Sequence, residues 1–236
     1  MVHRISIAGR KAIVSGGSSG IGRAIVQAIR AEGGTAIYAD RVPPANSDVA
    51  GFHQCDLTKP DEVSYFHEEC KQSFGVPDIL VLNAGRGISQ RLDEGDIAQW
   101  EYIFQLNVFS ALRLLHLFLP EMKKNGFADV VFISSVSSFH PYQTGAVYSA
   151  TKAALDNISE VLRLENMPGI RVTTIAPGVV RSDFFRNNID GTSDVDSLEM
   201  GFIEPEEIAD AVIYAITRRK DIALNHIVIR PTQQEM

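Results

Sequence analysis

The chain has 236 residues, of which 45 % are hydrophobic and 22 % charged, the usual balance of a globular protein. Its net charge of −7 argues against nucleic acid or an anionic membrane as a partner, because both attract clustered Lys and Arg. No run of about 18 apolar residues predicts a transmembrane helix, and residues 1–6 lack the apolar core of a signal peptide. Cys55 and Cys70 lack metal-ligand spacing, so we expect buried thiols, no metal site and a reducing cytoplasm.

A glycine-rich turn follows the first predicted strand, residues 11–15, and precedes a helix that ends near residue 32. Glycines let the backbone approach a diphosphate, and the start of a helix offers unpaired N–H groups and a positive dipole end. The turn therefore predicts a dinucleotide site. Its candidate contacts are Gly16, Ser18, Ser19, Gly20, Ile21 and Gly22.

The second predicted strand, residues 35–39, ends at Asp40 and Arg41. A carboxylate here can accept hydrogen bonds from the adenosine ribose and would repel a 2′-phosphate, whereas Arg41 could attract that phosphate. We therefore expect NAD rather than NADP as the cofactor. The alternative is that Asp40 is only a polar strand terminus.

Further strands are predicted at residues 51–55, 78–82, 128–134, 170–176 and 225–229, with helices at 60–74, 96–124, 147–165 and 205–216. Residues 78–82 are unbroken in apolar character, as in a strand covered on both faces. The alternation of strands and helices predicts one doubly wound, Rossmann-type α/β domain over residues 1–236, with a mostly parallel seven-stranded sheet. Residues 183–202 are expected to form a loop or lid with a short helix.

Tyr148 and Lys152 lie one turn apart on a predicted helix, and Ser135 follows the fifth strand. A phenol ionises near pH ~10, and a nearby ammonium lowers that pKa. With a hydroxyl to hold a substrate oxygen, these groups would form an acid/base device. In isolation, a Tyr and a Lys at this spacing are more often surface neighbours. Asn107 would either hold a catalytic water or be a buried amide satisfied by the backbone.

These motifs, in this order and spacing, resemble the short-chain dehydrogenase/reductase family over nearly the full chain. The resemblance implies catalytic roles for Asn107, Ser135, Tyr148 and Lys152. It also implies cofactor contacts from Asp56, Leu57, Asn83, Ala84, Gly85, Pro177, Gly178, Val180 and Ser182, as well as from Tyr148 and Lys152. The family's usual glycine-rich C-terminal end is absent here.

The expected reaction is hydride transfer between a nicotinamide and the hydroxyl or keto carbon of a small alcohol, hydroxy acid or carbonyl compound. Tyr148 would act as the acid/base, and Lys152 would lower its pKa and bind the nicotinamide ribose. The alternatives are an NADP-dependent carbonyl reductase or a catalytically silent dinucleotide-binding regulatory protein. The family further implies a homodimer or homotetramer and a substrate loop near residues 183–203. Candidate substrate contacts are Arg86, Ser137, His140, Tyr142, Phe184 and Phe185.

Overall fold

The computed structural model describes residues 4–45, 50–190 and 200–235. Its strands form one seven-stranded sheet in the order β3-β2-β1-β4-β5-β6-β7, and all neighbouring strands are parallel. The bounds are β1 Lys11–Ser15, β2 Thr35–Asp40, β3 Phe52–Gln54, β4 Ile79–Leu82, β5 Ala128–Ile133, β6 Ile170–Pro177 and β7 His226–Ile229. The predicted α/β class is confirmed, and the sheet is wholly rather than mostly parallel.

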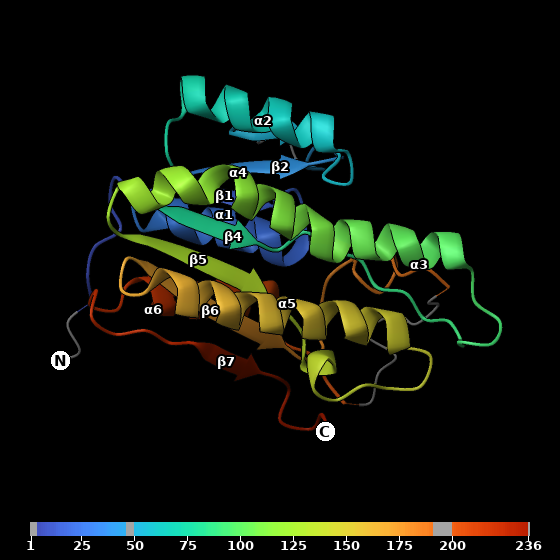
Figure 1. Ribbon diagram of the computed structural model, residues 1–236. Coiled ribbons are helices and arrows are strands. Elements are labelled where there is room, and N and C mark those ends of the chain that lie inside the picture. Colours follow the sequence, from blue (N-terminus) through green and yellow to red (C-terminus); the bar gives the residue numbers. More distant parts are fainter. Residues whose placement is uncertain (1–3, 46–49, 191–199, 236) are drawn as a thin grey trace.

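Helices cover both faces of the sheet (Figure 1). One layer holds α2 (Pro60–Ser73), α3 (Ile97–Phe104), α4 (Ser110–Lys124) and α5 (Ala146–Asn166), and the other holds α1 (Gly20–Ala31) and α6 (Pro205–Ile216). A five-residue π-helical turn, η1 (Gln105–Phe109), joins α3 to α4. A short 3-10 turn, η2 (Val136–Ser138), follows β5.

The central strand β5 shows why apolar runs predicted this sheet correctly. Val130 and Phe132 pack into the core beneath α2, α4 and α5, whereas Val131 and Ile133 pack into the core beneath α1 and α6. Successive side chains of a strand point to opposite faces, so a strand covered on both sides is mostly apolar on both; the exception in β5 is Asp129, which is paired with arginines.

The continuous helical stretch from Ile97 to Lys124 is long and apolar enough, by length and composition, to cross a membrane. This differs from our expectation that the sequence has no such segment. In the structure, 44 % of its most apolar window is buried inside the protein. It packs against α2 and α5, which is the environment of a core helix.

The order of the strands reverses between β1 and β4. The edge formed by the carboxyl ends of the strands is therefore the expected ligand site. In open parallel sheets, ligands bind at the carboxyl ends of the strands at such a point. The turns after β1, β4, β5 and β6, which carry most of the predicted site residues, all lie at this edge.

A buried ion-pair network fixes the opposite edge of the sheet. The Asp129 carboxylate lies 2.6 Å from Arg171 Nε and 2.8 Å from Arg10 Nη2. Arg171 also donates to four carbonyl oxygens at and beyond the end of α6, from Ile216 to Ile222. This network therefore lies at the amino ends of the strands, opposite to the carboxyl ends where most of the predicted site residues lie.

The loop after β6 is described in part. Residues 183–187 form turns, and Asp190 ends the described part of this loop. The rest of the predicted lid, residues 191–199, lies outside the described residues.

Candidate active site

The turn after β4 is bonded directly to the glycine turn after β1. The Asn83 side-chain amide donates to the carbonyl oxygens of Ser15 and Gly16, both at 3.0 Å. In return, the Ser15 hydroxyl accepts from the backbone N–H groups of Asn83 (2.9 Å) and Ala84 (3.0 Å). These four bonds hold the two predicted cofactor turns in one arrangement.

The first turn requires glycine for two reasons, a left-handed backbone conformation and a lack of space for a Cβ atom. Gly16 has φ +70°, in the left-handed region that favours glycine. A Cβ on Gly22 would lie 2.0 Å from the Gly16 carbonyl oxygen and 2.5 Å from Asn83 Nδ2. A Cβ on Gly17, which the sequence analysis did not single out, would lie 2.4 Å from Tyr38 Cβ.

The start of α1 has the chemistry of a diphosphate site. Its N-cap, Ser19, makes no side-chain capping bond to the helix, and the buried Ser18 hydroxyl has no hydrogen-bond partner among the described residues. Gly20 begins the helix, followed by Ile21. Uncapped N–H groups at a helix N-terminus and an orphaned hydroxyl suit an anionic group, so these residues fit the nucleotide that the sequence predicts.

Asp40 lies beside this turn. One carboxylate oxygen accepts from the Ser18 N–H at 3.0 Å, and the other lies 3.4 Å from the Val42 N–H. The acid therefore supports the glycine turn through its hydrogen bond with Ser18. Arg41 is exposed, and its guanidinium reaches the Tyr102 hydroxyl at 3.4 Å.

Asp56 and Leu57 follow β3 in the neighbouring turn. Burial alone would raise the pKa of Asp56, but hydrogen bonds from the Thr58 hydroxyl (2.7 Å) and N–H (3.0 Å) leave that pKa below its usual value. The carboxylate is thus charged and held in place. Leu57 is buried in the core.

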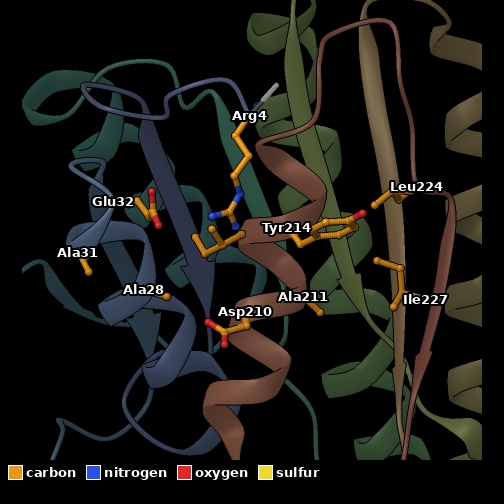
Figure 2. Close-up of a pocket in the computed structure, with 10 residues that line it drawn as sticks. Arg4, Ala28, Ala31, Glu32, Asp210, Ala211, Tyr214, Leu224 and Ile227 are labelled. Atoms are coloured by element: carbon orange, nitrogen blue, oxygen red, sulfur yellow. The ribbon is translucent and has the colours of Figure 1, made fainter. Parts of the chain in front are cut away.

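The turn after β6 faces the glycine turn. A Cβ on Gly20 would lie 3.3 Å from Ser182 Cβ, and a hollow of about 440 Å³ opens beside both residues. Pro177 ends β6, and the Gly178 N–H donates to the Ile229 carbonyl at 2.7 Å. Val180 is buried and pairs with Ile203. Another hollow, of about 700 Å³, lies elsewhere, between α1, α6 and β7, and includes none of the predicted site residues (Figure 2).

Tyr148, Lys152 and Ser135 come together at the start of α5 and the end of β5. All three are buried, with Tyr148 7 %, Lys152 4 % and Ser135 8 % exposed. Ser135 hydrogen-bonds the Tyr148 phenol. The Lys152 ammonium donates to the Ile133 carbonyl at 2.9 Å and lies 5.8 Å from the Tyr148 ring centroid.

Burial dominates the acid/base properties of this pair. It raises the pKa of Tyr148 well above the ordinary value, and the hydrogen bond with Ser135 only partly offsets this. Burial also lowers the pKa of Lys152 to about 8, with Asp156 acting in the opposite sense. The net shift of the Tyr148 pKa is thus opposite to the lowering expected from Lys152: burial dominates, and the ammonium donates to the Ile133 carbonyl.

Asn107 lies in η1 and is almost wholly buried. Its side chain accepts from the Arg86 N–H (2.9 Å) and donates to the Arg86 carbonyl and Thr151 Oγ1, both at 3.0 Å. The amide is thus satisfied largely by backbone, the second alternative from the sequence. A Cβ on Gly85 would lie 3.3 Å from Asn107 Oδ1 and 3.5 Å from Lys152 Nζ, so the turn after β4 closes directly over both.

Several candidate substrate contacts lie close to Tyr148. The Phe184 ring lies 5.6 Å from the Tyr148 ring and packs against Phe185. Tyr142 hydrogen-bonds Ser89 and is close enough to disfavour ionisation of Tyr148, contributing to its raised pKa after burial. The Ser137 hydroxyl accepts from Ser135 Oγ at 3.2 Å.

Two other candidates have partners within the protein. Arg86 Nε donates to the Asn187 carbonyl, so this part of its guanidinium holds the loop after β6. His140 is exposed, and its ring packs 4.9 Å from Phe139, which in turn lies 6.0 Å from the His226 ring on β7. The His140 ring thus belongs to a group of rings that extends toward the edge strand β7.

Sequence reasoning missed two residues that shape the site. The Thr151 hydroxyl accepts a hydrogen bond from Asn107. The position of Thr151 between Tyr148 and Lys152 was the signal in the sequence that could have identified it. Gln90 joins three segments around the pocket, yet its partners lie up to 100 residues away in the chain, so no local pattern marks it.

We predict that Gly22→Ala destabilises the protein and sharply weakens dinucleotide binding. The new methyl group cannot fit without moving the Gly16 carbonyl or Asn83, and such overpacking costs about 1–3 kcal/mol. Urea unfolding and titration with NADH measure the two effects. Gly169→Ala is the control, because its Cβ would meet its nearest neighbour at an ordinary 3.6 Å. Equal behaviour of the two variants would contradict this view of the turn.

Comparisons with known proteins agree with this geometry. A family model for short chain dehydrogenases matches residues 10–192. An uncharacterised oxidoreductase of Staphylococcus epidermidis is 31 % identical over 228 residues, covering 93 % of this chain and 96 % of the relative.

Two solved structures of similar fold contain bound nucleotides. An alcohol dehydrogenase from the archaeon Thermococcus sibiricus, complexed with 5-hydroxy-NADP, is 25 % identical with a TM-score of 0.83, covering 96 % of this chain and 98 % of that one. L-sorbose reductase from Gluconobacter frateurii, complexed with NADPH and L-sorbose, is 26 % identical with a TM-score of 0.84 and 98 % coverage of both chains. The present chain belongs to the short-chain dehydrogenase family and is an NAD(P)-dependent dehydrogenase or reductase.

Proposed function

We propose that this enzyme transfers a hydride between NAD and the hydroxyl or keto carbon of a small alcohol, hydroxy acid or carbonyl compound. The observation that carries the proposal is the buried set of Ser135, Tyr148 and Lys152, which lies at the edge of the sheet where the glycine turn also lies. When bound, the nicotinamide supplies or accepts the hydride.

In this proposal each side chain has a separate task. Tyr148 gives a proton to the carbonyl oxygen in reduction and takes one from the hydroxyl in oxidation. Ser135, already bonded to the phenol, orients the same oxygen. Lys152 brings a positive charge within one helical turn of the phenol, and Asn107 fixes the turn that closes over Lys152.

The apolar surroundings of the phenol suit a compact substrate. Tyr148 clusters with Ile88 and Ile103, and Phe184 and Ile189 pack against this cluster. Such walls exclude water from the reacting carbon, which strengthens the polar interactions made there. Ser137 and Tyr142 provide the hydroxyl groups nearest to this apolar surface.

NAD is the favoured cofactor because the Asp40 carboxylate would repel a 2′-phosphate. The second candidate is an NADP-dependent carbonyl reductase. Two observations favour it: Arg41 is exposed next to Asp40, and both similar structures described above contain NADP-type nucleotides.

Tyr148→Phe is predicted to lower kcat by roughly 10²–10⁴, the usual contribution of a general acid/base. Affinity for NADH should change little, because the ring and its packing against Phe184 remain. A panel of secondary alcohols with NAD, followed by absorbance of the reduced cofactor, identifies a substrate for the comparison. Tyr65→Phe, at an exposed position on α2, is the control. A Tyr148→Phe enzyme with more than roughly a tenth of wild-type kcat would exclude Tyr148 as the acid/base.

The cofactor preference can be measured directly as dissociation constants for NADH and NADPH. We expect NADH to bind at least about tenfold more tightly, since opposing negative charges are strongly unfavourable. Asp40→Asn should narrow this difference, because it removes the charge but keeps an oxygen to accept from the Ser18 N–H. Tighter binding of NADPH by the wild-type enzyme would instead support the carbonyl reductase alternative.

We also propose that the protein is a homodimer or homotetramer that associates through α4 and α5. Exposed apolar side chains lie on both helices or directly before them: Phe109 at the end of η1, Leu112 on α4, and Val161 and Leu164 on α5. Burying these groups against a second copy would be favourable. Sedimentation of the wild type and of Val161→Glu tests the proposal, with an oligomer that dissociates in the variant as the expected result. A wild type that is monomeric at micromolar concentration would refute it.

A further inference from the structure

The described part of the loop after β6 is hydrogen-bonded to the turn after β4, next to Tyr148. We call residues 184–190 the strap. Its contacts with residues 86–90 are Arg86 Nε to the Asn187 carbonyl, Ile189 N to the Gly87 carbonyl (3.1 Å), Ser89 N to the Ile189 carbonyl (3.0 Å) and Asn188 Nδ2 to Ser89 Oγ (3.0 Å). Through Phe184, the strap packs on the Tyr148 ring. Its position therefore decides how much room exists beside the phenol.

Gln90 ends this row of contacts, and its side chain uses both ends of the amide. Nε2 donates to the Asp190 carboxylate and, at 2.8 Å, to Gln99 Oε1. Oε1 accepts from Trp100 Nε1 at 2.6 Å and from the Asp96 N–H at 3.1 Å. One side chain thus ties the strap to the first turn of α3.

The main chain of Gln90 adds a third connection. Its N–H donates to the Thr144 carbonyl at 2.9 Å, two residues before α5 and four before Tyr148. The strap, the start of α3 and the segment that leads into the catalytic helix therefore all meet at this one residue.

Backbone strain supports a functional reason for this junction. Among the described residues, Thr144 (φ +65°) and Asp190 (φ +55°) are the two non-glycine residues with positive φ. Both are bonded to Gln90, Thr144 through the main chain and Asp190 through the side chain. Strained backbone persists only where surrounding contacts fix it, and it gathers at functional sites.

We propose that Gln90 is the positioning residue that sets the shape of the substrate pocket, by holding the strap, Trp100 and the approach to Tyr148 in one arrangement. The link to substrate rests on the function proposed above, whereas the positioning itself does not. The amide is required because it offers two donors toward Asp190 and Gln99 and an acceptor toward Trp100. A glutamate of the same size keeps only the acceptor and places a second carboxylate against Asp190.

The test compares Gln90→Glu with the double variant Gln90→Glu/Asp190→Asn, which exchanges donor and acceptor and so restores the bond. Gln72→Glu, at an exposed position on α2, makes the same chemical change away from the site. Three measurements need no turnover. They are deuterium uptake by the peptide that contains the strap, quenching of Trp100 fluorescence by acrylamide, and the dissociation constant of NADH. Trp100 is the single tryptophan of the chain.

We expect Gln90→Glu to speed deuterium uptake in the strap about tenfold, as expected when a charge-assisted hydrogen bond is replaced by repulsion. Trp100 should be quenched more readily, while NADH affinity stays within about twofold of the wild type. The double variant should return both readouts to near the values of the wild type and of Gln72→Glu. For the alcohol that the wild type oxidises best, Gln90→Glu should raise KM by a larger factor than it lowers kcat. The double variant should restore both constants.

Unchanged strap exchange and quenching in Gln90→Glu would overturn the proposal, as would a double variant that fails to restore them. These two readouts need no turnover. If the wild type oxidised no alcohol, the proposed function would fail while the positioning role could still be judged.

Discussion

Burial of a phenol and an ammonium one turn apart on one helix is the constraint on which the proposed active site depends. Removing both groups from water disfavours the charged form of each, so the Tyr148 pKa is raised and the Lys152 pKa is lowered to about 8. At neutral pH the protein alone thus holds a protonated phenol beside a largely protonated amine. That state suits donation of a proton to a carbonyl. Accepting a proton from an alcohol requires additional positive charge near the phenol, which oxidised nicotinamide would supply.

The surrounding structure keeps that pair in register with the cofactor turn. Asn83 bonds the first two cofactor turns to each other, and Asn107 holds the second turn over Lys152. Both asparagines use their side chains on backbone groups, so their contribution is geometric. In the proposed function, Gln90 does the same for the substrate side. Amide side chains are suited to this work because each offers donors and an acceptor without adding a charge.

The sequence predicted the parts of the structure that local patterns determine. An unbroken apolar run identified β4, because a strand covered on both faces has no polar side. The direction of the Tyr148 pKa shift could not be predicted, since the spacing to Lys152 says nothing about depth of burial or about the Ile133 carbonyl that the ammonium meets. The bond between Arg86 and Asn187 could not be predicted either, because Asn187 lies in a loop about a hundred residues away. Such long-range contacts arise only from the assembled fold.

The ionisation of Tyr148 itself tests the central claim most directly. Carbon-13 NMR of ring-labelled tyrosine, with Tyr148→Phe to assign the signal, follows the phenol through an alkaline titration with and without NAD⁺. The account predicts that Tyr148 in the protein alone stays protonated beyond the ordinary value near pH ~10, and that NAD⁺ shifts its titration to lower pH. A phenol that titrates at its ordinary value in both states would contradict the account.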